Sequence, residues 1–226
     1  MDLVILEFED KVEEINEYFE FVKITTHLRG FSDNTDMIQV SQTVHNVLKA
    51  NMFLLLYNLV ESSFKNALEN ICLQITNDRL KYQNVIPEIK KIWINKEYRN
   101  FEQQCTLPRD MSKPEFIMNK IDTIAEDMIL LTFNDELSGN VTSTHIKALV
   151  KEYGLNSDEV NNRDSEASFI VKGKRNSLAH GNESFNECGR GYAIERLENI
   201  KNESIDYMRF ILEHIQIFIE EKKYAN

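Results

Sequence analysis

One stretch, from Thr43 to Thr76, limits most strongly what this chain can fold into. It contains no glycine and no proline, and its middle, residues 50–64, is apolar on nearly every side when drawn as a helix. A helix that is apolar all round cannot face water and must be covered by other elements. The stretch therefore predicts a long central helix that the rest of the chain buries.

Further helices are predicted by apolar residues spaced three and four apart and by capping residues. The chain of 226 residues has only 7 glycines and 3 prolines, so few residues interrupt such helices, and strand patterns are weak. Besides the central helix, we expect helices at about 2–28, 113–130, 143–153, 165–179 and 194–221, with a capping box at Ser112–Glu115, a cap at Asp164 or Ser165, and stops at Gly154 and Gly181.

The segments between these helices are less regular. Residues 77–113 contain Trp93 in a short amphipathic pattern, residues 156–164 form a polar connector, and residues 182–191 are rich in turn formers. Helices joined in this way pack into bundles. The prediction is an all-α helical bundle with an irregular helical insertion.

The charge balance limits the partners that the chain can bind. With 26 basic and 37 acidic residues, the formal net charge is -11. This charge argues against a broadly basic surface for nucleic acid. RNA can bind only at a local basic patch, or after a partner neutralises part of the surface. The composition, 42% hydrophobic and 28% charged, is that of an ordinary globular protein.

The cysteines and the N-terminus predict a cytoplasmic protein without membrane contact. Cys72, Cys105 and Cys188 stand alone, with no CxxC pair to indicate a disulfide framework or a zinc site. Free thiols are typical of a reducing compartment. The first ten residues are acidic and lack the basic start of a signal peptide. The apolar runs are too short to span a bilayer.

The residues with the most distinctive chemistry lie at the end of the helix expected at 165–179. Arg175, Asn176 and His180 fall within six positions of the run KGKRNSLAHGN. Arginine is a permanent cation whose planar guanidinium binds phosphate oxygens, and histidine transfers protons near neutral pH. The combination indicates phosphodiester chemistry that needs no metal ion.

The reaction expected at this motif is attack of an RNA 2′-hydroxyl on the adjacent phosphate. His180 would transfer a proton, Arg175 would stabilise the phosphorane, and Asn176 would orient the imidazole or bond to a phosphate oxygen. On a regular helix, Arg175 and His180 differ by about 140° around the axis. They converge on one cleft if the helix loosens at its end, or if a second subunit closes the site.

Three more residues are candidates to support the site. Glu61 lies in the apolar central helix, where an unpaired carboxylate is costly. It can anchor Arg175 or polarise His180, or it can form a structural pair at the rim. Arg190 lies between two glycines that let the backbone approach a ligand closely. Tyr192 can stack on a base, but it can equally pin the turn to the core.

Lysines around the motif add local positive charge. Lys172 and Lys174 are candidates to bind RNA, and Lys147 and Lys151 are further members of the same basic cluster. Such a cluster can guide phosphates to the cleavage site. Taken one by one, the lysines fit a solvated helix face better.

The sequence gives no support for other common kinds of site. His27, His45, His145 and His214 lack the spacing of metal ligands. Ser177 precedes a histidine by three residues, but no strand-turn-helix elbow surrounds it, which argues against a serine hydrolase. No glycine-rich phosphate loop occurs. We therefore expect no metal and no cofactor.

The motif and its surroundings resemble HEPN domains, the helical domains of many prokaryotic toxin and antiviral ribonucleases. Arg-Asn-x-x-x-His matches their RxxxxH pattern. The segments FLLLYNLVESSF, IKALVKEYGLN and RNSLAHGNESFNECGRGY, followed by a last long helix, are similar to the HEPN-like nuclease family of the MAE_28990/MAE_18760 type. The resemblance covers about residues 45–220, and residues 1–44 fit it less distinctly.

The resemblance implies a single HEPN-like domain over residues 1–226. Its core would comprise about residues 43–76 and 165–221, and residues 77–160 would form the insertion. It also implies metal-independent endoribonuclease activity, often from two motifs that meet across a homodimer. The expected role is the toxin or effector of a toxin–antitoxin or antiviral defence system, with RNA as substrate and a cognate antitoxin or other defence protein as partner.

On this match Arg175 and His180 carry over as catalytic residues, and Asn176 as the polar residue after the arginine. Two other interpretations fit the sequence. The first is a non-catalytic helical module that binds a cognate partner protein or a nucleotide, which the acidic net charge suggests. The second is a toxin that is regulated by modification of a nearby side chain such as Tyr192 or Ser177.

Overall fold

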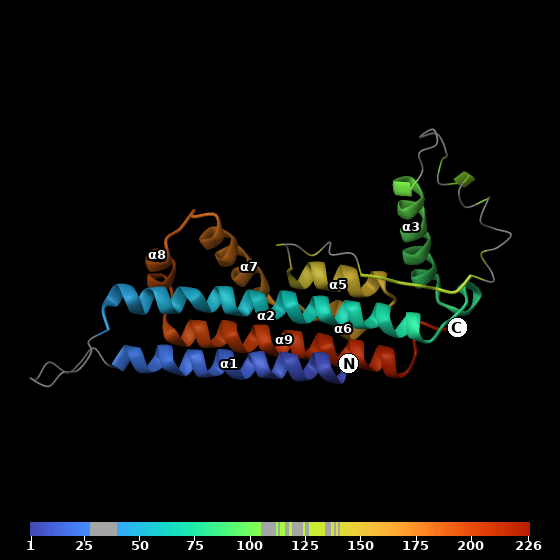
Figure 1. Ribbon diagram of the computed structural model, residues 1–226. Coiled ribbons are helices and arrows are strands. Elements are labelled where there is room, and N and C mark those ends of the chain that lie inside the picture. Colours follow the sequence, from blue (N-terminus) through green and yellow to red (C-terminus); the bar gives the residue numbers. More distant parts are fainter. Residues whose placement is uncertain are drawn as a thin grey trace, which may run out of the picture.

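Three long helices run side by side and form the body of the molecule (Figure 1). They are α1 (Asp2–His27), α2 (Gln42–Asn77) and α9 (Ile194–Glu220), and each packs on the other two. The computed structural model describes residues 1–27, 40–104, 127–133 and 141–226, together with Ser112, Pro114, Glu115, Met118, Ile124, Leu137 and Gly139.

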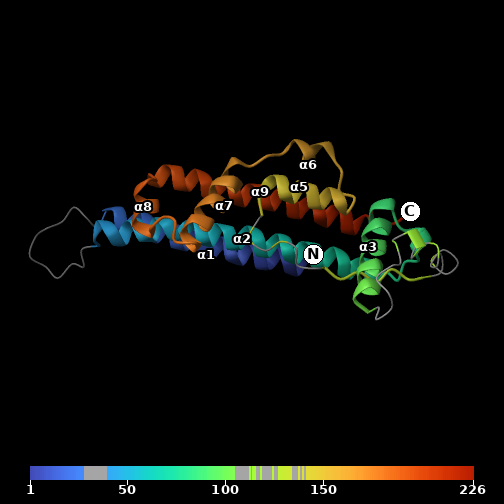
Figure 2. The ribbon, with the colours of Figure 1, turned by 90° about the horizontal axis from the view of Figure 1, so that it is seen from above.

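Shorter helices lie beside this body, and they are η1 (Tyr82–Asn84), α3 (Pro87–Gln104), α5 (Ser143–Glu152), α6 (Asp158–Asn162), α7 (Glu166–Ala179) and α8 (Phe185–Arg190). Of these, α5 follows the long axis of the body in both views (Figure 1, Figure 2). Both α7 and α8 pack directly on α2, and α5 contacts α7. Beyond α5, α3 stands at the far end of α2 and crosses the long axis (Figure 1).

The core forms around α2 because this helix is apolar around most of its circumference. Its Phe53, Leu56, Phe64 and Leu68 are completely buried. Each such side chain contributes about 1.5–3 kcal/mol when it leaves water. The apolar stripes of α1 and α9 cover two sides of α2, which explains why one long apolar stretch dictates a helical bundle. The stripe residues are Phe8, Val12, Ile15, Phe19 and Val22 on α1 and Leu197, Met208, Ile211, Leu212 and Ile215 on α9.

The predicted boundaries of α1, α2, α5, α7 and α9 are confirmed to within two residues. Helix α7 begins after Ser165, whose hydroxyl accepts a hydrogen bond from the Ser168 backbone N–H at 3.2 Å. Gly154 (φ +96°) and Gly181 (φ +70°) follow the ends of α5 and α7 in the left-handed region. Glycine adopts this region without strain, so it stops a helix efficiently. The all-α fold class is therefore confirmed.

The region after α2 differs from the prediction. The short amphipathic helix expected around Trp93 is an 18-residue helix, α3. The helix expected at about 113–130 is wrong at its end, because residues 127–133 are not helical. Lys81 and Met128 form an antiparallel bridge there, and the Ile129 N–H donates to the Leu80 carbonyl at 2.8 Å.

The extended backbone buries Ile129 and Leu131 against the end of α2 while its polar groups stay hydrogen-bonded. Burial of these side chains together with the hydrogen bonds to Leu80 and Thr76 outweighs local helix propensity. Most of the remaining predicted helix lies outside the described residues. In the predicted capping box, the Ser112 N–H and hydroxyl donate to Glu115 at 2.7 and 2.9 Å.

The turn-rich stretch expected at residues 182–191 contains a further helix, α8. Its N-terminus has a full capping box, in which Ser184 and Glu187 bond to each other's backbone N–H. Gly189 brings α8 against the backbone of α2. A Cβ atom at this position would lie 1.8 Å from the Asn46 carbonyl oxygen. The sequence prediction missed α8 because Gly189 within it and Gly191 directly after it are typical of turns, whereas Gly189 here serves packing.

None of the described helices offers an apolar window that could cross a bilayer.

Candidate active site on helix α7

Arg175 projects from α7 toward α2 and contacts three side chains, two on α2 and one on α7. Its Cζ atom lies 4.0 Å from the centre of the Tyr57 ring, within the range of a cation–π contact. Nη1 donates to the Asn176 side-chain oxygen at 2.8 Å, and Nη2 lies 3.7 Å from a Glu61 carboxylate oxygen. The Arg175 side chain is 22% exposed, so solvent still reaches it.

The Glu61 carboxylate connects these groups to the residues that precede α5. It accepts hydrogen bonds from the Tyr57 hydroxyl and from the Gly139 backbone N–H, both at 3.0 Å. The Tyr57 oxygen in turn accepts from the Val141 backbone N–H at 3.3 Å. The sequence suggested that Glu61 could anchor Arg175 or polarise His180. The structure places Glu61 beside Arg175, and among the described residues it shows no contact between Glu61 and His180.

Burial is the main cause that raises the pKa of Tyr57, and the hydrogen bond to Glu61 adds to the increase. The Val141 N–H acts in the opposite direction. The hydroxyl therefore stays protonated and available as a donor to Glu61 at all physiological pH values. A protonated donor keeps the carboxylate in one place beside the guanidinium.

His180 is the residue at which α7 ends. Its backbone N–H donates to the Asn176 carbonyl at 3.0 Å, and its φ and ψ angles of -92° and 0° continue the helical turn. The residue is exposed, and its imidazole makes no hydrogen bond to the part of the chain that the structure describes. The imidazole therefore lies open to solvent.

The last turn of α7 is regular, so it does not bring Arg175 and His180 together. About 140° of rotation separates the two side chains around the helix axis. Asn176 shares a face with His180 by spacing, but its side-chain oxygen is taken by the guanidinium. Within one chain, Arg175 faces α2 and His180 faces solvent.

The other predicted supporting residues are engaged in packing. Lys174 pairs with both carboxylate oxygens of Glu183, at 3.0 and 2.8 Å, and its ammonium lies 5.6 Å from the Tyr192 ring centre. The Tyr192 ring packs edge-on against Phe53 at 4.8 Å. This geometry matches the alternative in which Tyr192 pins the turn to the core.

The remaining members of the basic cluster are dispersed. Arg190 is exposed on α8, and Lys172 is half-buried on α7. Lys147, on α5, pairs with Asp164. The positive charge around the motif is thus smaller than the sequence suggests, because acidic residues neutralise two of its lysines.

Two groups near Arg175 were not predicted from the sequence. Tyr57 precedes Glu61 by four residues, and this spacing puts both side chains on one face of α2. That signal was present in the sequence but is common in helices. Gly139 reaches the site through its backbone N–H, so no residue type could have indicated it.

Among the described residues, no three His, Cys, Asp or Glu side chains gather closely enough to hold a metal ion. Burial raises the pKa of the Cys188 thiol to about 11, so this thiol stays protonated and unreactive.

The chain matches the family model described as MAE_28990-like HEPN over residues 2–224. No curated protein and no solved structure matches it. The match begins within α1, which the sequence resemblance fitted less distinctly, and runs through the end of α9. The helical order and the Arg175–His180 motif on α7 lie inside it. The chain belongs to the MAE_28990-like HEPN family.

Proposed function

We propose that this protein is an endoribonuclease that cleaves RNA without a metal ion. Support comes from membership of the HEPN family and from one observation at the site. The exposed His180 caps the C-terminus of α7, the same helix that carries Arg175, and the contacts of Arg175 with neighbouring side chains fix its position. A proton-transfer group and a preorganised cation are the two components that this reaction requires.

In the proposed reaction, a base removes the proton of a 2′-hydroxyl, and the oxygen attacks the adjacent phosphorus. A bond forms between this oxygen and phosphorus, the bond from phosphorus to the 5′-oxygen of the next nucleotide breaks, and this leaving oxygen takes up a proton. His180 carries the proton transfer. Arg175 contacts the phosphate oxygens, since the 3.7 Å separation from Glu61 leaves Nη2 without a short hydrogen bond to the carboxylate.

The divergence of Arg175 and His180 supports a dimeric active site. Because one regular helix points the two groups about 140° apart, a second copy of the chain would have to supply the missing partner. We accordingly propose that the active protein is a homodimer. Asn176 is a positioning residue in this arrangement, because it bonds to the guanidinium.

The proposed reaction is tested by RNA cleavage in EDTA with the purified protein. We expect wild-type cleavage, a loss of about 100-fold or more in His180→Ala and Arg175→Ala, and no cleavage of the matching DNA strand. Arg196→Ala, which removes an exposed arginine on α9, is the control and should cleave normally. Cleavage that survives both site variants, or that chelation abolishes, contradicts the mechanism.

The biological role that we propose is the toxin or effector of a defence system. Induced expression should arrest cell growth, and His180→Ala should relieve the arrest. A second candidate, a non-catalytic module, draws support from the internal contacts that engage Arg175 and from the net charge of -11. It predicts no growth arrest and tight co-purification with a second protein.

A further inference from the structure

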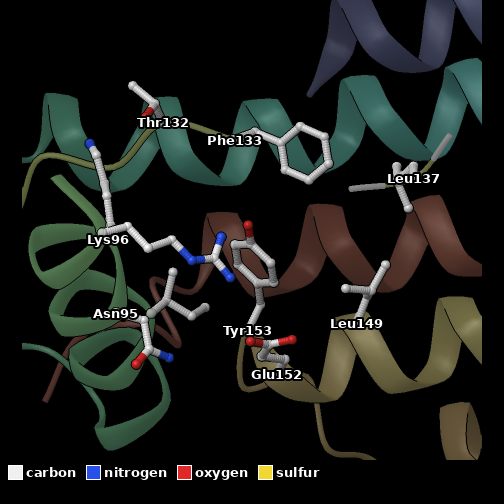
Figure 3. Close-up of a pocket in the computed structure, with 10 residues that line it drawn as sticks. Asn95, Lys96, Thr132, Phe133, Leu137, Leu149, Glu152 and Tyr153 are labelled. Carbon is white, nitrogen blue, oxygen red and sulfur yellow. The ribbon is translucent and has the colours of Figure 1, made fainter. Parts of the chain in front are cut away.

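A solvent-accessible cavity of about 90 Å³ lies between α3, α5 and the extended segment at 127–133. Figure 3 shows Lys96 on α3 extending toward Thr132 of the extended segment, with Phe133 beside α2 and Tyr153 directly after α5. Its volume is below the several hundred Å³ of an enclosed small-molecule site. It fits one ring system of a larger molecule whose remainder lies in solvent.

The lining combines an aromatic surface with positive charge. Phe133 and Leu149 are half-buried and supply the apolar wall. Lys96 and Arg99 supply two cations, against the single carboxylate of Glu152. The cavity is thus locally positive in a chain whose net charge is -11.

A hydrogen bond fixes the position of one cation. The Lys96 ammonium donates to the Leu130 carbonyl at 2.8 Å, so it is held at the rim of the cavity. An ammonium has three N–H donors, and this bond uses one of them. The residue is therefore oriented and still able to bind an anion.

We propose that this cavity binds one nucleotide, with its base stacked on Phe133 and its phosphate contacted by Lys96 and Arg99. The nucleotide belongs to the RNA strand that the Arg175 site cleaves, and this part of the proposal rests on the proposed function. Proteins usually bind a single strand with aromatic side chains that stack on its bases and with cations that contact its phosphates. The cavity therefore acts as a substrate subsite at a distance from the scissile phosphate.

The position of the cavity suits such a subsite. The Tyr153 hydroxyl in its lining lies 3.6 Å from the Cys72 sulfur on α2, and Glu61 of the active site lies on the same helix. Eleven residues of helix correspond to about 17 Å, which a few nucleotides of extended strand can span. Leu137 also lines the cavity, and Gly139, two residues later, donates to Glu61.

The test uses a fluorescent hexanucleotide with 2′-O-methyl riboses, which the proposed reaction cannot cleave. We expect Phe133→Leu and Arg99→Gln each to weaken its binding about tenfold. Arg99→Gln should also lower the slope of log affinity against log salt by about 0.7, since one phosphate contact is lost from a single strand. Phe133→Leu should leave that slope unchanged. Such a contrast distinguishes ligand contacts from a general disturbance of the fold.

Lys91→Gln is the matched control, because Lys91 is an exposed residue of α3 outside the cavity. The affinity of this variant for the hexanucleotide should stay within about twofold of wild type. Equal binding by wild type, Phe133→Leu and Arg99→Gln overturns the site. A binding measurement with AMP in place of the hexanucleotide distinguishes a free mononucleotide from a nucleotide of an RNA strand as the ligand. AMP that binds as tightly as the strand, with the same dependence on Phe133, overturns the RNA assignment.

The two proposals fail in different ways. A protein that binds the hexanucleotide through Phe133 and Arg99 but cleaves no RNA has the nucleotide site without the proposed activity. A protein that cleaves RNA while both variants bind and cleave normally has the activity without this subsite.

Discussion

Arg175 is fixed by its neighbours before any substrate arrives. The Tyr57 ring supports one face of the guanidinium, and Glu61 and Asn176 lie at its edge. A cation held in this way loses little conformational freedom when a phosphate binds. Tyr57 is the central residue, because its ring contacts the cation while its hydroxyl orients the Glu61 carboxylate.

At this scale we predict that Tyr57→Phe separates the two roles of Tyr57. The phenylalanine ring keeps the contact with Arg175, but the hydrogen bonds to Glu61 and from the Val141 N–H are lost. We expect the free energy of unfolding to fall by about 1–2 kcal/mol. If the proposed activity holds, kcat for RNA cleavage falls while KM changes little. Urea unfolding and steady-state cleavage measure the two effects, and a loss of stability with unchanged kcat would assign Tyr57 a structural role only.

The helices place the motif through contacts that are specific to each element. Ser165 caps α7 and fixes where it begins, and Gly181 fixes where it ends, so His180 is the residue that directly follows the helix. On the neighbouring α8, Gly189 allows the closest approach to α2. Close packing of this kind tolerates no added volume.

For α8 we predict that Gly189→Ala is strongly destabilising. The new methyl group would lie 1.8 Å from the Asn46 carbonyl oxygen, and backbone atoms cannot move aside as side chains do. We expect a loss of about 2–3 kcal/mol in the free energy of unfolding. Gly173→Ala on α7 is the control, because its Cβ would meet nothing within 4 Å. The control should stabilise the protein by about 0.5–1 kcal/mol, and equal effects of the two substitutions in urea unfolding would disprove this account of α8.

At the scale of the whole molecule, the C-terminal residues return to the end of α2. The Tyr224 hydroxyl donates to Asp78 at 2.7 Å, and the Lys222 ammonium lies 2.9 Å from the same oxygen. The hydrogen bond from Lys222 is the main cause that lowers the pKa of Asp78, and that from Tyr224 adds to it. This carboxylate therefore links the last residues of the chain to the core helix.

The linkage predicts an acid-dependent contribution to stability. Folding lowers the pKa of this carboxyl, so the carboxylate stabilises the protein at pH values above the pKa of the unfolded state, about 4. The contribution disappears as the pH falls through the lower pKa of the folded state. Asp78→Asn should cost about 1 kcal/mol at pH 7 and progressively less below about pH 4. Urea unfolding over this range measures the difference. Asp10→Asn, at an exposed site on α1, should cost little, and a constant cost for Asp78→Asn at all pH values would refute the linkage.

The proposed dimer makes a prediction for mixed chains. If each site takes Arg175 from one chain and His180 from the other, a heterodimer of Arg175→Ala and His180→Ala chains contains one intact site. Random mixing of two inactive variants should therefore restore about a quarter of the wild-type activity. Co-expression of the two variants, followed by cleavage assays in EDTA, measures the restoration. A mixture that stays as inactive as either variant alone is incompatible with this shared site.

Much of the helical framework could be predicted from the sequence because the signals are local. Apolar spacing and capping residues are properties of short segments, and they gave the bounds of α1, α2, α5, α7 and α9. The extended residues 127–133 could not be predicted, because they pair with Leu80 and Lys81, which are remote in the sequence. The division of the domain into a core at 43–76 and 165–221 and an insertion at 77–160 stays a prediction.

The sequence alone determined that the chain folds as helices around α2 and that Arg175 lies near the end of a short helix which His180 directly follows. Only the tertiary structure decided where these groups point and what they contact. Tyr57 and Glu61 on α2 and the Gly139 N–H meet Arg175 because packing brings distant segments together. Helix propensity and apolar periodicity act over a few residues, whereas the surroundings of a side chain depend on the whole packed core, and this difference in range separates what could be predicted from what could not.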